Sequence, residues 1–296
     1  MYKNKVAVKA LGKYTYAQAL LEESLTIRQS LADKQGIAAS LEALGTLAYD
    51  QNDLDTALQF FEQSVALRKE IGDQLNLAHA INSLGRVAHV RGDYLKARQL
   101  FTQSLHLHQK IGDKHGIATA LNNLGCVAND ENYLDQAYTY FQQSYRYYQE
   151  QGSKFGVALT LNNLALTGRM QGKLEESLLQ YRQALLINQE LGNIQRISEV
   201  ITGIGAVAGI QEHLEKAARL FGFAEAFVQQ AGASLPPSDL NNYLTQKTAV
   251  RNQMGEEPFS RAWGAGQAMT LDQAIEYALH SEASSPAEET GLAERQ

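Results

Sequence analysis

The sequence predicts an all-α protein, an α-solenoid of antiparallel helix pairs that ends in a helical cap. A forty-residue period recurs along the chain without slippage, and fixed periods of this kind indicate stacked repeats. Within each period, apolar residues follow one another at spacings of three and four, which is typical of amphipathic helices. The 296 residues include only 4 prolines, so long helices can run without interruption.

Composition restricts the class of protein further. The chain is 44% hydrophobic and 20% charged, as expected of a globular protein. Its single cysteine, Cys126, excludes an internal disulfide framework and a zinc site built from cysteines. The net charge of −6 leaves no excess of lysine and arginine to neutralise phosphates. No segment approaches the roughly 18 apolar residues of a membrane span, so we expect a cytoplasmic protein without membrane contact.

Three series of residues define the repeat. Each unit carries a Leu–Gly pair or a close variant, then a small residue, then an aromatic residue. These markers are Leu44, Leu84, Leu124, Leu164 and Ile204, then Ala57, Ala97, Ala137, Ser177 and Ala217, then Phe61, Phe101, Phe141, Tyr181 and Phe221. The predicted full units are 33–72, 73–112, 113–152, 153–192 and 193–232. Most of one further unit precedes them in 1–32.

Each unit is expected to form two helices, as the unit 113–152 illustrates. Its first helix carries one apolar stripe, and its second helix buries another set of residues after a break at 132–133. The first stripe consists of Ile117, Ala118, Leu121, Leu124 and Ala128. The second set is Leu134, Ala137, Phe141, Tyr145 and Tyr147, whereas Tyr138, Tyr140 and Tyr148 are expected to be partly exposed.

Glycines and capping residues are expected to shape the joints between helices. The small residue in the first helix, such as Gly125, lets the two helices approach, and Phe141 fills the space beneath it. A glycine such as Gly112 ends the second helix in the left-handed conformation. The following residue, such as Asp113, caps the next helix by accepting hydrogen bonds from its free N–H groups.

The period is lost after residue 232, and the rest of the chain is expected to be a helical cap over 233–280. A break at 235–238 is followed by predicted helices over 239–254, 257–269 and 270–279. The third helix opens with the capping-box spacing of Thr270 and Gln273. The polar, acidic segment 281–296 is predicted to be a disordered tail.

The order of the markers resembles the tetratricopeptide repeat. The Leu–Gly pair, the turn between the helices, the small residue and the aromatic residue carry the resemblance, which covers about 13–232. That motif has about 34 residues, whereas these units have 40 and lack its proline near the end of the second helix. The resemblance implies a right-handed superhelix, with the first helix of each unit on the concave face.

A narrower resemblance covers about 200–280. This part is similar to the C-terminal end of bacterial signalling ATPases and of LuxR-type or maltose-activator-like regulators. The residues that carry it are the segments 217–226 and 235–237, then Phe259, Ala262, Trp263, Gly266, Met269, Thr270, Leu271 and Ala274. In those families a nucleotide-binding switch precedes a tetratricopeptide sensor array. This sequence shows neither an ATPase nor a DNA-binding module, so a separate signalling ATPase is a candidate partner.

No motif predicts catalysis, a cofactor or a metal. The glycines of 203–209 lack the spacing of a dinucleotide-binding loop, and no strand precedes them. His106 and His108 are two residues apart on a helix and therefore point away from each other, which makes them a poor pair of metal ligands. Cys126 has no partner cysteine and is expected to pack or to line a groove. The chain is therefore predicted not to be an enzyme.

The resemblance implies a partner-binding groove along the first helices of the repeats. Asparagine recurs at one inward position as Asn82, Asn122 and Asn162, and such a ladder can pair with the backbone of an extended peptide. A solvated polar face without any ligand is the alternative. Basic residues that could hold a terminal carboxylate are scarce. The full predicted groove comprises Glu42, Thr46, His79, Asn82, Arg86, His89, Asn122, Asn123, Cys126, Asn129, Asn162, Asn163, Leu166 and Arg169.

Two functions are compatible with these patterns. The first is a non-enzymatic interaction module that binds a protein or peptide segment in the groove, as a scaffold or as the sensor part of a bacterial signalling system. The second is a transcription regulator, by analogy with the LuxR-type relatives, that acts through nucleic acid or through a DNA-binding partner. The nearly neutral repeats argue against direct contact with nucleic acid.

Overall fold

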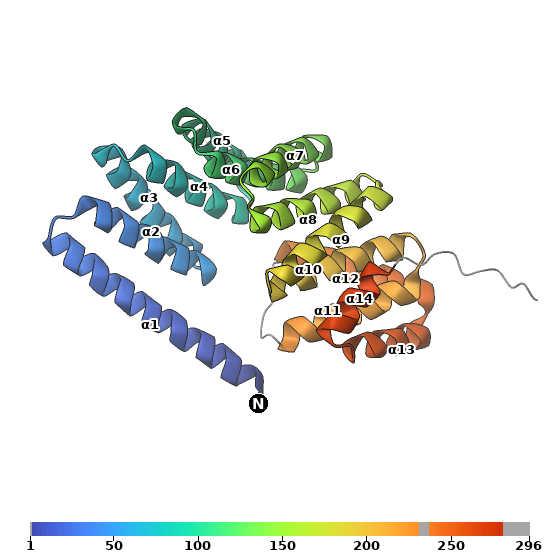
Figure 1. Ribbon diagram of the computed structural model, residues 1–296. Coiled ribbons are helices and arrows are strands. Elements are labelled where there is room, and N and C mark those ends of the chain that lie inside the picture. The colour runs from blue at the N-terminus through green and yellow to red at the C-terminus, as the bar shows by residue number, and fades with distance from the viewer. Residues whose placement is uncertain (1, 231–236, 281–296) are drawn as a thin grey trace, which may run out of the picture. The chain divides into compact units, whose positions relative to one another are not determined.

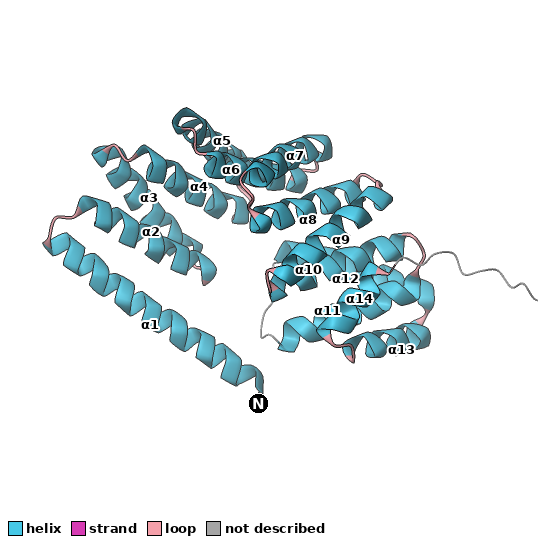
Figure 2. Ribbon diagram, viewed as in Figure 1, coloured by secondary structure: helices cyan, strands magenta, loops and turns pink. Residues whose placement is uncertain are grey.

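The computed structural model describes residues 2–230 and 237–280, and the side chains of 14–230 and 243–280. Throughout these ranges the secondary structure is helical, with short turns between helices (Figures 1 and 2). The repeat helices are α1 (Tyr2–Ser30), α2 (Lys34–Asp50), α3 (Leu54–Ile71), α4 (Gln74–Val90), α5 (Tyr94–Ile111), α6 (Lys114–Asp130), α7 (Leu134–Glu150), α8 (Lys154–Met170), α9 (Leu174–Glu190), α10 (Ile194–Ile210) and α11 (Leu214–Gln230). They are followed by α12 (Pro237–Met254), α13 (Glu256–Gln267) and α14 (Leu271–Leu279).

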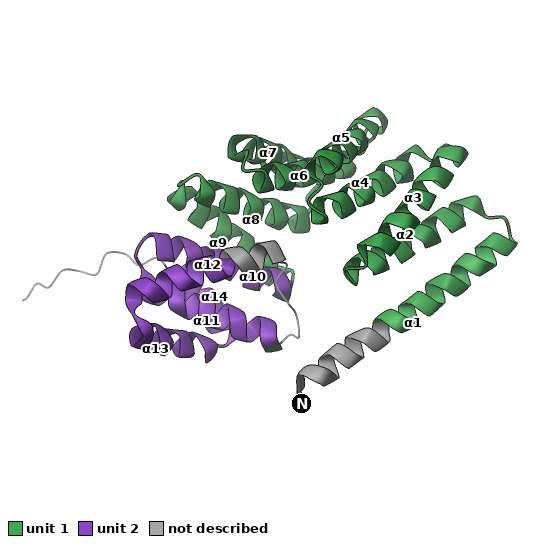
Figure 3. Cartoon of the chain, turned by 180° about the vertical axis from the view of Figure 1, so that it is seen from behind, with its two compact units in different colours: residues 1–194, 230–234 green, residues 195–229, 235–296 purple. Residues whose placement is uncertain are grey.

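The chain divides into two compact units (Figure 3). The first comprises 1–194 with 230–234, and the second comprises 195–229 with 235–296. The last predicted repeat, 193–232, thus groups mainly with the C-terminal helices. None of the described helices is both long enough and apolar enough to span a membrane.

The first unit is a row of antiparallel helix pairs, and the predicted fold class is confirmed. Each first helix packs on the second helix of its own repeat, as α4 does on α5 and α6 on α7. The first helices α2, α4, α6 and α8 also contact one another in sequence. The predicted partial repeat over 1–32 contributes one continuous helix, α1, which packs against α2.

The core of each pair follows the predicted contact between a small residue and an aromatic ring. Phe61, Phe101 and Phe141 are each at most 2% exposed. A Cβ atom added to Gly125 would lie 2.5 Å from the ring of Phe141, so only a residue without a side chain leaves room for the ring. The small residue of the first helix therefore sets how closely the two helices approach.

A buried hydroxyl adds a polar contact to the same interface. Ser104 Oγ in α5 donates to the carbonyl oxygen of Ala78 in α4 at 2.8 Å, and Ser144 repeats this bond to Ala118 one unit later. Ser64 forms the equivalent bond at 3.1 Å. Because each serine is fully buried, these bonds satisfy groups that water cannot reach.

The joints have the predicted geometry. Gly72 and Gly112 end α3 and α5 with φ of 75° and 73°, in the left-handed region. Asp73 and Asp113 follow them and accept backbone hydrogen bonds from the first turns of α4 and α6. The chain therefore turns from one repeat to the next with its helix termini satisfied.

The tyrosine-rich helix α7 departs from the prediction at its C-terminal end. Tyr148, which was expected to be partly exposed, is only 4% exposed, whereas Tyr145 and Tyr147 are half-buried rather than buried. Tyr148 lies seven residues after Phe141, two turns along the same face, and its ring packs where a side chain on Gly156 would stand. The side chain at this position is buried between two repeats, as are its equivalents Arg68 and His108 in earlier units.

The second unit packs the C-terminal helices on α10 and α11. A buried cluster joins residues of α10 and α11, such as Phe221, to Tyr243, Val250 and Phe259. Gly222 in α11 meets the backbone of Trp263 so closely that a Cβ atom would lie 2.3 Å from its carbonyl oxygen. The predicted capping box of α14 is present. The predicted acidic tail lies outside the described residues.

Candidate functional site

The predicted asparagines lie on the first helices α4, α6 and α8, and four of them bind one another in pairs. Asn123 Nδ2 in α6 donates to Asn82 Oδ1 in α4 at 2.9 Å. Asn163 Nδ2 in α8 donates to Asn122 Oδ1 in α6, also at 2.9 Å. The asparagines therefore form two rungs that connect successive repeats, an arrangement that the sequence analysis did not foresee.

Each rung leaves part of its hydrogen-bonding capacity for other partners. An asparagine offers two donor hydrogens and one carbonyl acceptor, and a rung uses one donor and one acceptor. Asn122 is only 6% exposed, and its Nδ2 lies 3.9 Å from Cys126 Sγ. Asn82, Asn123 and Asn162 are half-buried, and together with Asn122 and Asn163 they form the asparagine row of α4, α6 and α8.

Several charged members of the predicted groove are engaged within the fold. Glu42 accepts a hydrogen bond from Arg68 at 2.7 Å, and Arg68 also binds Asp73 at 2.8 Å. His89 contacts Asp130 at 2.7 Å, which connects α4 to α6. Glu42 is therefore paired with the second helix of its own repeat, whereas His89 joins two neighbouring repeats.

Of the other predicted groove residues, some are partly exposed and some are buried. Arg86 is half-buried and stacks over the ring of Tyr49 at 4.3 Å, so its guanidinium remains beside the row. Arg169 is buried in α8 rather than displayed on its surface. The remaining members are Thr46, which bonds to the backbone of its own helix, Asn129, which accepts from Thr167, and the half-buried Leu166.

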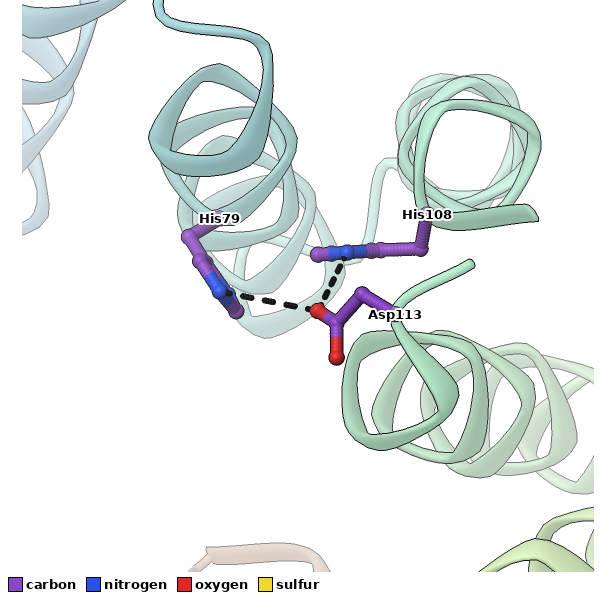
Figure 4. Close-up of side chains that lie close together, drawn as sticks. All are labelled: His79, His108 and Asp113. Carbon is purple, nitrogen blue, oxygen red and sulfur yellow. Dashed lines mark ion pairs between the residues drawn. The ribbon is translucent and has the colours of Figure 1, made fainter. Parts of the chain in front are cut away.

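A second cluster lies at the joint between the units 73–112 and 113–152. His79 of α4, His108 of α5 and Asp113, the cap of α6, converge there (Figure 4). His108 Nδ1 lies 2.8 Å from Asp113 Oδ2, and His79 Nε2 lies 3.9 Å from the same oxygen. The two imidazole rings are 4.7 Å apart between centroids. Two rings and one carboxylate thus share a small volume.

The environment favours neutral imidazole at His108. Burial lowers its pKa, and the neighbouring His79 lowers it further, which together outweigh the opposite effect of Asp113. A neutral imidazole retains a nitrogen lone pair that can accept a proton or bind a metal.

The sequence analysis missed this cluster because it compared only histidines close together in sequence. His79 and His108 belong to the two helices of one repeat, and packing of α4 on α5 brings them together. The corresponding residues of the next repeat, Thr119 and Tyr148, also touch, with their hydroxyls 3.0 Å apart. Comparing paired positions across units would therefore have found the contact.

Comparison with protein families points to one family. Tetratricopeptide repeat profiles match residues 5–70, 76–150 and 157–191. No curated protein sequence matches the chain.

Several solved structures share the fold at low sequence identity. BtubC from P. vanneervenii has a TM-score of 0.63 and 18% identity over 75% of this chain and 94% of its own. A signal transduction ATPase with numerous domains and a tetratricopeptide repeat sensor, from Pyrococcus horikoshii, has a TM-score of 0.61 and 15% identity over 89% of this chain. The match spans only 40% of that ATPase. A Rap protein in complex with Competence and Sporulation Factor has a TM-score of 0.60 and 10% identity over 93% of this chain and 90% of its own.

Proposed function

This chain belongs to the tetratricopeptide repeat family, and on that premise we propose that it is a non-enzymatic module that binds a protein or peptide segment. The observation that carries the proposal is the row of first helices with its polar rungs. Asn82, Asn123 and Asn162 keep donors and acceptors available along α4, α6 and α8. Repeated amides of this kind suit an extended backbone, whose N–H and C=O groups also recur at regular intervals.

The charges beside the row favour a partner of mixed polarity. Arg86 and His79 add donors, whereas Asp50 and Asp130 are exposed acceptors at the C-terminal ends of α2 and α6. A purely acidic or purely basic segment would meet like charges along part of this surface. We therefore expect a polar segment that carries charges of both signs.

The similar structures support a role in signalling. The ATPase of similar fold carries its repeats as a sensor, and the Rap protein was solved with Competence and Sporulation Factor bound. We infer that this chain is a scaffold or the sensor part of a bacterial signalling system, and that a separate ATPase module is a candidate partner. The alternative, a transcription regulator that acts through nucleic acid or through a DNA-binding partner, rests on the LuxR-type resemblance alone, and we do not propose it.

Binding through the row can be tested with paired amide variants. The full chain first recovers a partner from the native host by pull-down. The double variant Asn82→Ala with Asn162→Ala is then compared with Gln103→Ala with Gln143→Ala, which removes two exposed amides from the second helices α5 and α7. Asn122 is left intact because it is buried.

We expect binding affinity to fall only in the double variant that lacks asparagines of the row. Each lost hydrogen bond costs about 0.5–1.5 kcal/mol, so the first double variant should weaken binding by roughly 1–3 kcal/mol. The control should bind like the unchanged chain. Equal affinity of both double variants, with helicity intact by circular dichroism, would place the binding site elsewhere.

A further inference from the structure

We propose that His79, His108 and Asp113 form a binding site for a divalent transition metal, with Zn²⁺ as the best-fitting ion. Their donor atoms all lie within 4.8 Å of one another. Each residue comes from a different element, namely α4, α5 and the cap of α6, so the site exists only in the folded repeats (Figure 4).

The buried imidazole of His108 borders the cluster, and its Nδ1 is not satisfied by a hydrogen bond. His108 is 1% exposed, and its Nδ1 is buried and forms no hydrogen bond of suitable direction, although Asp113 Oδ2 lies 2.8 Å away. A buried polar atom left in this state costs free energy, and a bound cation would repay that cost. The ring is held in place because it packs where a side chain on Gly116 would stand.

The carboxylate has one oxygen to spare. Asp113 Oδ1 accepts the backbone N–H of His115 at 3.1 Å and so caps α6. Oδ2 is the atom that faces both imidazoles. The structural and the proposed metal-binding roles of Asp113 therefore use different oxygens.

The fold does not require histidines at these positions. In the preceding joint the equivalent of His108 is Arg68, whose ion pairs satisfy it, and in the following joint it is Tyr148, whose hydroxyl contacts Thr119. Among the repeats that the structure describes, the joint at His108 alone combines two imidazoles with a carboxylate. The combination is thus an addition to the architecture rather than a consequence of it.

The donor set selects the class of ion. Imidazole nitrogen suits Zn²⁺ and other late transition metals, whereas Mg²⁺ and Ca²⁺ prefer oxygen alone. Zinc–nitrogen bonds of about 2.0–2.1 Å in a tetrahedron place neighbouring ligand atoms about 3.3 Å apart. The observed separations of 2.8 and 3.9 Å lie on either side of that value. His79 has a side chain that is 40% exposed and can turn to close the set, with solvent at the fourth position.

A bound ion would clamp the joint between two repeats. It would connect helices α4 and α5 of one unit to the first turn of α6 in the next. Since the ion binds the folded state alone, it should raise the free energy of unfolding as its concentration exceeds the dissociation constant.

The test uses the untagged full chain, freed of metal and titrated with Zn²⁺ by calorimetry and with Co²⁺ by visible absorption. One ion per chain and the absorption of tetrahedral Co²⁺ are expected. His79→Ala and Asp113→Asn should each weaken Zn²⁺ binding at least about tenfold, and the asparagine still offers an oxygen to cap α6. His106→Ala removes an exposed histidine from the same helix as His108 and should leave binding unchanged.

Two results would overturn the site. One is the absence of stoichiometric Zn²⁺ binding by the unchanged chain. The other is binding that His79→Ala leaves as tight as His106→Ala does, with both variants folded by circular dichroism. Because His79 is half-exposed, its variant keeps the test decisive even if the buried His108 tolerates no change.

Discussion

The contact between Gly125 and Phe141 predicts that Gly125→Ala destabilises the unchanged chain but not a chain that carries Phe141→Leu. In the unchanged chain a methyl group on residue 125 would stand 2.5, 2.7 and 2.9 Å from three ring carbons of Phe141. Carbon atoms pack best at about 3.5–4.0 Å, so the ring or the helix must move. Phe141 is 2% exposed, so a shift of its ring must displace packed neighbours.

The magnitude follows from two opposing contributions. Overpacking a filled core costs about 1–3 kcal/mol, whereas replacing glycine by alanine inside a helix gains about 1 kcal/mol. Gly125→Ala should therefore lower the free energy of unfolding by roughly 1 kcal/mol. In a Phe141→Leu background the planar ring is gone and the leucine can turn aside, so the same substitution should become neutral or stabilising by up to about 1 kcal/mol.

Hydrogen exchange of the amides in α6 and α7 measures this effect locally, which matters because repeat arrays need not unfold in one step. Gly264→Ala, followed by the exchange of the amides in α13, provides the control, since a Cβ atom there meets nothing within 4 Å and only the helix-propensity gain should remain. If Gly125→Ala changes protection by the same amount in both backgrounds, the ring contact does not set the distance between the helices.

Two further predictions concern the joint before α4 and the second unit. Partial burial acts to raise the pKa of Asp73, but its hydrogen bonds from Asn76 and the charge of Arg68 outweigh this and hold the pKa below the usual carboxyl value. The lowered pKa in the folded state contributes stability that is fully present above the unfolded-state pKa and is lost as the pH falls through the folded-state pKa. Asp73→Asn should therefore make the free energy of unfolding fall less steeply as the pH is lowered. An unchanged pH dependence on the acid side would contradict this. In the second unit, Gly222→Ala places a methyl group 2.3 Å from the backbone oxygen of Trp263, which cannot rotate away. Helix α13 should therefore separate from α11, and the tryptophan fluorescence should shift to the red. An unshifted spectrum would contradict the close packing.

The sequence predicted those features of the fold that depend on one position of the repeat. The glycine–aromatic contact, the left-handed Gly72 and the cap Asp73 recur in register, so a period of forty residues was enough to locate them. The burial of Tyr148 was not predicted because it depends on the contact of its ring with Gly156 in the next repeat. Arg68 and His108 are buried at the equivalent position, which therefore belongs to the core between repeats rather than to the surface.

The asparagine rungs escaped prediction because they depend on the offset between neighbouring helices rather than on the period. The two asparagine rungs and the pair of His89 with Asp130 all join residues 41 apart, one more than the repeat length. Successive first helices thus meet with a shift of one residue, so an asparagine at one inward position binds the asparagine that follows that position in the next unit. The adjacent asparagines of α6 are therefore not two copies of one feature. Asn123 is directed to the preceding repeat and Asn122 to the following one, and removing either should break the rung between a different pair of repeats.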